Sequence, residues 1–447
     1  MPQLTQLTPA APGGLPLLGH IPSLVRHRLA FMEEMRDHGG VVRVRLGRTP
    51  AYVISDARIA REVVSDGGTT FARGRFFRKL RPLLGDGLGT SDGPFHMRQR
   101  RMVQPAFHHS RPGYDIETMR AVIEARTSWW QPGMTLDIAK EMDRLGVALI
   151  TKTLFSSDTA AGEVQDVQES IADFMVGVGI RTVVPSDLLE RLPIPANRRF
   201  NAARDRLERA ITKVIADYRA DQRDHHDILS MLLAARDAEG LPMTDQQLRD
   251  EVLSLVVAGG DTTGHVLGWI FHELGQHPEV ERRLHDELDQ VLAGRTVTAD
   301  DLPKLGYAEQ VVNETLRRRS PGWLVMRRTT RALELGGVPI PADAELLVSP
   351  SALLRDPAVY PDPMRFDPDR WAPDRVGSMP RDLFLPFGAG TRKCAGEPLA
   401  RISMALVLAT LPTRFRLRPV PGHQVRELAL GTMSADKIPM TLEPRDT

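Results

Sequence analysis

The sequence predicts a mainly α-helical protein with a small β part, arranged as a single domain over residues 1–447. Apolar residues recur at helical spacing through most of the chain between residues 60 and 320, whereas alternating, strand-like patterns are short and widely separated. No internal repeat, low-complexity linker or block of like charge divides the chain. A length of 447 residues alone would allow two or three domains, but these patterns favour one helical domain whose sheet part is discontinuous in sequence.

The first elements can be placed from residue patterns. Residues 1–25 are rich in proline and glycine and predict an irregular lead. Helical spacing begins near Arg26 and stops at Gly39. Residues 41–46 and 51–54 then alternate between apolar and other side chains around a short connection that contains glycine and proline. This pattern predicts a β-hairpin.

The long middle part of the chain is predicted to be helical. Segments with helical spacing include residues 60–65, 116–130, 142–154, 164–178, 202–219 and 228–238. Strand-like pieces return at 333–337 and 345–348, and again near the C-terminus. Prolines between Pro185 and Pro195 interrupt the helical pattern, and we interpret this stretch as a mobile connection between helices rather than a domain boundary.

Composition excludes several classes of function. The 58 basic and 57 acidic side chains nearly cancel, so no net charge favours nucleic acid or an anionic membrane as a partner. No apolar run approaches the roughly 18 residues that a spanning helix needs, and the first residues do not resemble a secretory signal. A single cysteine excludes an internal disulfide. We expect a cytoplasmic protein that does not enter a membrane.

The only cysteine, Cys394, lies in a loop rich in glycine and positive charge. A lone cysteine is usually a small, buried, inert residue. A packing cysteine does not need such a loop, whereas a thiolate needs nearby backbone N–H groups and small neighbours that let a flat ligand approach. The apolar run 399–411 predicts a helix that begins just after the cysteine, and a helix N-terminus favours the thiolate.

A second unusual stretch is residues 258–263, Ala-Gly-Gly-Asp-Thr-Thr, inside the apolar run 252–274. Two adjacent glycines destabilise a helix interior by about 1 kcal/mol each relative to alanine. One interpretation is a helix that lets a neighbour pack closely, with threonine hydroxyls bonded to carbonyls one turn earlier. The other is a helix opened locally over a ligand, with an acid and a hydroxyl at the gap.

The cysteine loop resembles the heme-binding loop of the cytochrome P450 family. The pattern Phe-x-x-Gly-x-Arg-x-Cys-x-Gly is met by Phe387, Gly390, Arg392, Cys394 and Gly396. The resemblance implies a cytochrome P450 fold, a helical bundle around a heme b (iron protoporphyrin IX) with a minor sheet region. It also implies that Cys394 is the thiolate ligand of the heme iron.

The glycine-rich helix is similar to the oxygen-binding segment of the same family, small-Gly-x-acid-Thr. The resemblance implies that Thr262 hydrogen-bonds dioxygen at the heme and that Asp261 relays protons. Because both residue types are present, the resemblance favours oxygen activation over the family's rearrangement reactions. His265, three residues further on, either faces the same cavity or packs behind it.

Two further motifs complete the resemblance. Glu314 and Arg317, with Arg370 downstream, are similar to the family's Glu-x-x-Arg pair and its third arginine, so a structural role is implied, although alone such a pair is usually solvated. Asp369 and Trp371 stand where the family often shows Glu and Phe. The adjacent Arg318 and Arg319 are interpreted as surface charge.

Positive side chains for the two heme propionates follow from the resemblance. His96 and Arg100 are four residues apart on one helix face. Alone they would be a surface pair of little meaning, but two donors on one face suit a dicarboxylate. The family places His and Arg there, and Arg327 and Arg392 match its other propionate contacts.

The resemblance also implies a substrate pocket, although apolar residues at helical spacing are more often core. The implied pocket residues are Phe76, Phe77, Leu84, Leu88, Phe174, Val178, Val257, Trp323, Leu324, Val325, Thr432 and Met433. Nearly all are apolar, which indicates an apolar substrate without a fixed charge.

The chain is therefore expected to be a heme-thiolate monooxygenase that uses O2 to oxidise an apolar small molecule. Pro105-Ala106-Phe107 and residues 192–200 are similar to bacterial members that oxidise cyclic terpenes, which favours hydroxylation of a cyclic terpenoid in secondary metabolism. The alternatives are a tailoring oxidase of a polyketide or aromatic product, acting by epoxidation, coupling or ring closure, and a non-catalytic heme-thiolate ligand sensor.

Electrons must come from separate proteins, because the chain has no nucleotide-binding or iron–sulfur motif. A ferredoxin and a ferredoxin reductase are expected as donors, with Arg98, Arg101 and Lys393 as a basic docking face. We expect a monomer.

Overall fold

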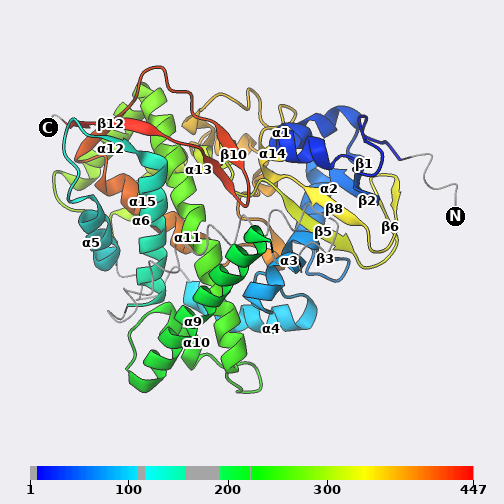
Figure 1. Cartoon of the computed structure of the whole chain (residues 1–447). Coiled ribbons are helices and arrows are strands. Elements are labelled where there is room, and N and C mark those ends of the chain that lie inside the picture. Colours follow the sequence, from blue (N-terminus) through cyan, green and yellow to red (C-terminus); the bar gives the residue numbers. More distant parts are fainter. Residues whose placement is uncertain (1–7, 108–115, 157–191, 193, 222, 446–447) are drawn as a thin grey trace.

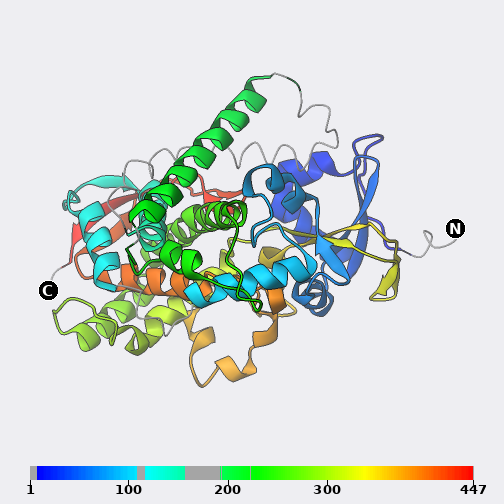
Figure 2. The same cartoon turned by 90° about the horizontal axis from the view of Figure 1, so that it is seen from below.

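The computed structural model describes residues 8–107, 116–156, 192, 194–221 and 223–445. In Figure 1 a large helical part, which holds the C-terminus, lies beside a smaller part that holds the N-terminus and most of the β-strands. Figure 2 shows the same division from below. The fold is mainly helical with small sheets, as the sequence predicts.

The described helices share one arrangement: most surround the long α11, which passes through the centre of the helical part (Figure 1). The α-helices are α1 (Ile21–Glu34), α2 (Ala57–Ser65), α3 (Arg75–Leu84), α4 (Gly93–Val103), α5 (Ile116–Thr127), α6 (Ile138–Leu154), α9 (Pro195–Asp221), α10 (Ile228–Ala234), α11 (Asp245–Gln276), α12 (Pro278–Leu292), α13 (Gly306–Arg318), α14 (Pro350–Leu354) and α15 (Glu397–Thr410). The 3₁₀ turns are η2 (Met35–His38), η3 (Gln104–Phe107), η5 (Leu302–Lys304), η6 (Pro368–Trp371), η7 (Val376–Ser378), η8 (Arg381–Leu383) and η9 (Gly390–Arg392). None of these helices has a stretch long and apolar enough to cross a bilayer.

The largest sheet is built from distant parts of the chain. Its five strands lie in the order β1 (Val41–Leu46), β2 (Thr49–Ile54), β8 (Glu345–Val348), β5 (Val325–Thr329) and β3 (Phe71–Arg73). The smaller sheets pair β4 (Thr135–Asp137) with β12 (Pro439–Pro444) and β9 (Phe415–Pro419), β10 (Glu427–Ala429) with β11 (Met433–Ala435), and β6 (Leu333–Leu335) with β7 (Val338–Ile340). The predicted hairpin is confirmed as β1 and β2.

Both faces of the central strands are buried, which explains their apolar runs. On β2, Tyr52 and Ile54 join one apolar cluster, whereas Ala51 and Val53 join another on the opposite face. This alternation follows from the two-residue period of a strand. A third and larger cluster fills the helical part.

The closest helix contact is between α6 and α11, which lie side by side in Figure 1. A Cβ added to Gly264 would lie 2.6 Å from the Asp143 Cα, and one added to Gly146 would lie 2.7 Å from the Gly264 backbone nitrogen. The two backbones therefore touch at a point where neither helix has a side chain. This contact fixes the spacing of α6 and α11.

Several expectations need adjustment or lie outside the description. The helix predicted from residue 142 begins at Ile138, and the strand expected at 333–337 is a short hairpin with β7. The predicted helix at 164–178 lies outside the described residues, as does nearly all of the proline-rich connection. Strands β3 and β5 were not predicted, because three to five residues are too few to show a clear period.

Candidate active site

The cysteine loop is a tight turn that leads into the N-terminus of α15. The backbone N–H of Cys394 donates to the carbonyl of Phe387 at 2.8 Å, and this bond closes the loop. Gly390 has a φ of 64°, and a Cβ there would lie 2.0 Å from the carbonyl oxygen of Ser65 at the end of α2. Glycine is required at this position both by the backbone conformation and by the approach of α2.

The thiol of Cys394 is surrounded by protein yet keeps an accessible surface, as a group lining an internal space does. Burial raises its pKa, while the backbone N–H groups of Gly396 and Glu397 and the charge of Arg100 act in the opposite direction. The sequence-based expectation of a lowered thiol pKa is wrong for the free thiol, because desolvation is the larger effect. A bound metal ion deprotonates a coordinating thiol outright. An accessible thiol with two amide donors beside it fits that role.

One face of α11 is accessible although the helix lies inside the molecule. Ala258, Asp261, Thr262 and His265 keep accessible surface, and their spacing of three or four residues places them on one side of the helix. The Thr262 hydroxyl donates to the Ala258 carbonyl at 2.8 Å. Burial raises the pKa of Asp261, so its carboxyl holds a proton more readily than an exposed aspartate. His265 therefore lies on the accessible face, which answers the question left open by its spacing.

The adjacent glycines do not interrupt α11, which is helical from Asp245 to Gln276. A Cβ on Gly259 would lie 2.8 Å from the side chain of Ile150 on α6. Of the two interpretations of this stretch, the structure shows close packing with back-bonding of the threonine hydroxyl, and the expected local opening is absent from the described helix. The roles of Asp261 and Thr262 stay predictions.

A second feature of the site is a group of buried basic side chains, three arginines and a histidine, which we call the cation cluster: Arg73, His96, Arg327 and Arg392. Arg73 on β3 lies directly opposite Arg327 on β5 in the sheet register. Like charges directly opposite each other destabilise a sheet. The Nε atoms of Arg73, Arg327 and Arg392 have no hydrogen-bond partner in the described part of the structure.

Negative charge from the chain offsets only part of this cluster. Asp92 pairs with Arg392 and accepts from the Arg73 backbone N–H. Burial and the neighbouring guanidiniums still lower the pKa of Arg327 to about 10 and that of His96 to about 4. Buried cations that repel one another fit a ligand that carries negative charge.

Three of the residues predicted to contact the propionates come to this region from two elements, α4 and η9. His96 approaches Ser91 through Nδ1 at 3.3 Å and the Thr391 carbonyl through Nε2 at 3.4 Å. Arg392 lies on η9, within the cysteine loop. Arg100 donates to the Lys393 carbonyl at 2.7 Å and lies beside the thiol.

Sequence reasoning missed Arg73. The signal was present, because an arginine in the short apolar run Phe71-Ala72-Arg73 is an unusual choice for a strand whose residues are all buried. What the sequence did not show is the pairing of β3 with β5, which brings Arg73 to Arg327.

The Glu-x-x-Arg motif forms a second group of buried charges, which we call the lock: Glu314, Arg317 and Arg370. Glu314 and Arg317 are fully buried and form two hydrogen bonds of 2.9 Å. Arg370 lies 3.4 Å from the same carboxylate. The indole N–H of Trp371 donates to Glu314 at 3.0 Å, so the departure from Phe adds a hydrogen bond.

The interpretation of Arg318 and Arg319 as surface charge is wrong. Arg319 is buried and donates to Glu273 at 3.0 Å, and it also pairs with Glu427. Arg318 pairs with Glu273 and is only 15% exposed in its side chain. The acids come from α11 and β10, far away in the sequence, so the arginine run alone could not show them.

The predicted pocket residues differ in accessibility. Those that keep accessible surface are Phe76, Phe77, Val257, Leu324, Val325 and Thr432. Those that are buried are Leu84, Leu88, Trp323 and Met433. Phe174 and Val178 lie outside the described residues. Met433 is fully buried and packs in the apolar cluster on one face of the large sheet rather than presenting surface to the accessible face of α11.

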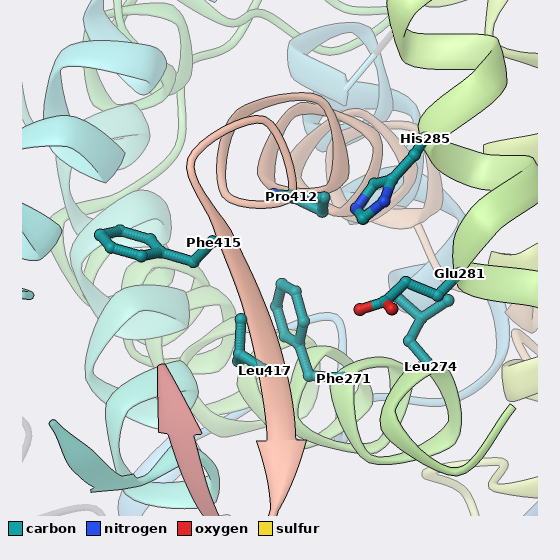
Figure 3. Close-up of a pocket in the computed structure, with 7 residues that line it drawn as sticks. All are labelled: Phe271, Leu274, Glu281, His285, Pro412, Phe415 and Leu417. Carbon is teal, nitrogen blue, oxygen red and sulfur yellow. The ribbon is translucent and has the colours of Figure 1, made fainter. Parts of the chain in front are cut away.

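A small hollow elsewhere in the helical part belongs to packing rather than to this site. Figure 3 shows Glu281 and His285 reaching toward it from α12, opposite the rings of Phe271 and Phe415. It has room for about one water molecule, and the Nε2 atom of His285 has no partner in the described structure. None of its lining residues belongs to the cysteine loop, the cation cluster or the accessible face of α11.

Comparison with known proteins agrees with this geometry. The profile of the family described as Cytochrome P450 matches residues 9–438. Cyclooctat-9-en-7-ol 5-monooxygenase of Streptomyces melanosporofaciens is 40% identical, with 99% of this chain and 97% of that protein covered. Pentalenene oxygenase of Streptomyces avermitilis is 36% identical, with 97% of this chain and 96% of that protein covered.

Solved structures show the same fold. The P450DA heme domain matches with a TM-score of 0.87 at 23% identity and covers 98% of each chain. The retinoic acid-bound cyanobacterial CYP120A1 matches with a TM-score of 0.87 at 25% identity and covers 98% of this chain and 99% of its own.

Proposed function

The chain belongs to the cytochrome P450 family and is a heme b-dependent monooxygenase; from this premise we propose that it hydroxylates an apolar cyclic terpenoid. The observation that carries the substrate proposal is the likeness over nearly the full chain to proteins named for oxidising cyclic terpenes, at 36–40% identity. The apolar character of the predicted pocket residues supports it, because such a wall offers few partners to a charged substrate.

The described residues fit the cofactor. Cys394 would supply the thiolate ligand, supported by the amides of Gly396 and Glu397. Arg100 and the cation cluster would bind the two propionates. The negative charges of the propionates would balance the positive charge that the chain leaves without a counter-ion in the cluster. When bound, the heme supplies the activation of dioxygen and the transfer of one oxygen atom to substrate.

Residues on the accessible face of α11 would transfer protons during the reaction. The Thr262 hydroxyl donates to the Ala258 carbonyl, so its oxygen lone pairs remain free to accept a hydrogen bond. Asp261 lies next to it, and burial raises the pKa of this carboxyl. We assign Asp261 the role of proton donor and Thr262 that of the hydroxyl through which the proton passes.

Electrons reach this enzyme from redox partner proteins, and we propose a ferredoxin and its reductase. Arg101 is exposed and suits an acidic partner, while Lys393, exposed within the cysteine loop, pairs with Glu397 at 2.5 Å. Arg98, which the sequence placed on the same docking face, donates to Asp237 at 2.7 Å and is therefore less available. The cytoplasmic location and the monomeric state stay predictions.

An absorbance titration of the heme protein tests the substrate class. Cyclic terpene hydrocarbons, terpene alcohols, fatty acids and macrolactones would be added separately while the spin state is followed. A shift to high spin with the terpenes, followed by hydroxylated product in the presence of ferredoxin and reductase, is the expected result. A shift only with macrolactones or aromatic polyketides would replace the terpenoid proposal by a tailoring oxidase. Binding without any turnover would indicate a ligand sensor.

A further inference from the structure

A polar cluster beside the cysteine site has no part in the roles assigned above. His265 on α11 lies between two groups from other elements. Its Nδ1 atom is 2.8 Å from the Thr432 hydroxyl, and its Nε2 atom is 3.5 Å from an oxygen of Asp143 on α6. The hydrogen bond to Thr432 orients the ring, and Nε2 faces Asp143 Oδ1, a buried oxygen that has no hydrogen-bond partner in the described structure.

The glycine contact between α6 and α11 explains why these side chains meet. A Cβ on Gly264 would collide with the Asp143 Cα, so the Asp143 backbone lies directly against α11 at the turn that carries His265. Asp261 lies one turn earlier, on the same accessible face as His265. The helix crossing thus places a second carboxyl beside the acid of the oxygen-binding segment.

The surroundings of Asp143 favour a protonated carboxyl. The charged groups that act on it are Asp137 at the start of α6 and, once it has given up its proton, Asp261 on α11, and both are negative. The neighbouring Arg144 on its own helix pairs with Glu141 instead, and Thr432 contributes only a neutral hydroxyl. Enclosure by protein, followed by these two acids, raises the pKa of Asp143 to about 8, and burial lowers the pKa of His265 to about 4.

Asp143 is nevertheless reached by water, because 37% of its side chain is exposed. The Oδ1 atom of Asp143 is buried, so the accessible part of the side chain lies away from His265. At neutral pH the cluster therefore combines a neutral imidazole, a carboxylic acid and a route for water. A neutral imidazole has one donor and one acceptor nitrogen, so the Thr432 hydroxyl can donate to Nδ1 while the Nε2–H side of the ring faces Asp143.

We propose that Asp143, held in place by His265, is the proton reservoir that recharges Asp261 during oxygen activation. The proposal rests on the role assigned to Asp261 and Thr262. After Asp261 has passed its proton toward Thr262, the O–H bond of Asp143 breaks and a new O–H bond forms on Asp261 through water in the space between them. The negative charge moves from Asp261 to Asp143, and a proton from bulk solvent, relayed by water that is itself left unchanged, then returns to Asp143. No electron is transferred in this step.

Infrared difference spectroscopy on the heme protein tests the state of Asp143 without turnover. The carbonyl band of a protonated carboxylic acid should be present at neutral pH, disappear as the pH rises through about 8, and be absent in Asp143→Asn. In His265→Gln the band should shift or titrate at another pH, because the ring that holds the carboxyl is gone. Glu141→Gln, which removes an acid from the same helix, is the matched control and should leave the band unchanged. A band that titrates near pH 8 and persists in Asp143→Asn, or no band that titrates there in the native protein, would overturn the proposal.

The second measurement is the coupling of electron consumption to product formation. In Asp143→Asn the product formed per electron pair should fall about tenfold, at or below the lower limit for a direct acid catalyst, and Asp143→Glu should restore part of it. Substrate binding followed by the spin state should not change. If Asp143→Asn couples as well as Glu141→Gln while Thr262→Ala uncouples, the reservoir is refuted and the role of Thr262 stands. If Thr262→Ala also couples normally, the assignment of the oxygen-activating residues fails with it.

Discussion

The molecule buries charge in two places, and they differ in whether the chain itself supplies the opposite charge. In the lock, the carboxylate of Glu314 accepts two hydrogen bonds from Arg317 and one from Trp371, and carbonyls of Leu354 and Pro363 accept further bonds. In the cation cluster, Asp92 forms the one ion pair described for three arginines, and two of these arginines face each other across a sheet.

This difference distinguishes a group of charges that stabilises the fold, the lock, from a group that suits a negatively charged ligand, the cation cluster. Burying charge is tolerated when every ion finds its partner inside the chain, as in the lock. A cluster with an excess of one sign is stable only when a ligand brings the other sign. The comparison therefore supports the proposal that the cation cluster binds the negatively charged propionates.

The largest expected effect follows from breaking the lock. Glu314→Gln removes the only carboxylate within reach of Arg317 among the described contacts and should destabilise the protein by about 3–5 kcal/mol. Denaturant unfolding of the protein measures this loss. A change below about 1 kcal/mol would mean that the carbonyl partners alone can hold Arg317, and the contrast with the cation cluster would disappear.

Substitution in the cation cluster should act on the ligand instead of the fold. Arg327→Leu removes a buried cation that has no carboxylate of its own, so the heme-free protein should keep or gain stability. The affinity for heme should fall by a factor of about 10–100, since a hydrogen bond to a charged group contributes about 1.5–3 kcal/mol. Heme transfer to an acceptor protein measures the affinity.

Arg101→Leu is the control for that experiment, because Arg101 is exposed and lies outside the cluster. Equal losses of heme affinity in both variants would show that overall positive charge, rather than the cluster, holds the propionates.

The pH dependence of the heme-free protein should show the excess of positive charge directly. The pKa of His96 is lowered to about 4 by burial and by Arg392 and Arg73, whereas the unfolded chain has an ordinary histidine. Below a pH of about 6.5 the unfolded state binds a proton that the folded state does not, so stability falls as the pH drops toward 4.

Bound heme should weaken this pH dependence of stability, because the two propionate carboxylates would raise the pKa of His96. Each unit by which that pKa rises corresponds to about 1.4 kcal/mol of stability at low pH. Unfolding of native protein and of His96→Asn at several pH values, with and without heme, measures the difference. The same loss of stability toward low pH in His96→Asn would assign the effect to other buried histidines such as His272 and His285.

The smallest effect is expected at the rim of the lock. Asp369 pairs with Arg283 through two bonds of 2.8 Å, but both side chains are exposed to solvent. Asp369→Asn should change stability by less than about 1 kcal/mol, as for other surface ion pairs. A loss as large as that of Glu314→Gln would show that the rim and the buried lock act as one unit.

Much of the fold class and of the cysteine loop could be predicted from the sequence, because both are encoded locally. Helical period is repeated over many residues, and Cys394 with its glycines stands within ten positions. The lock could be predicted as a motif, but its burial could not, since the residues that cover it lie more than forty positions away.

What could not be predicted depends on pairings between distant segments. Arg73 meets Arg327 only because β3 pairs with β5, and His265 meets Asp143 only because two glycines let α6 touch α11. Arg318 and Arg319 were misinterpreted for the same reason, because Glu273 and Glu427 come from other elements. A periodic pattern reports which side of an element is apolar and carries no information on which element will cover it.

The contact of Gly146 with Gly264 also sets a limit on how this enzyme can be redesigned. Since no side chain separates the two backbones, the distance between α6 and α11 is determined by main-chain atoms and not by any residue that a library of pocket variants would sample. Making room for a bulkier substrate will therefore depend on side chains from elements other than this helix contact. A substitution at either glycine would push α11 away from α6 and displace Asp261 and Thr262 with it.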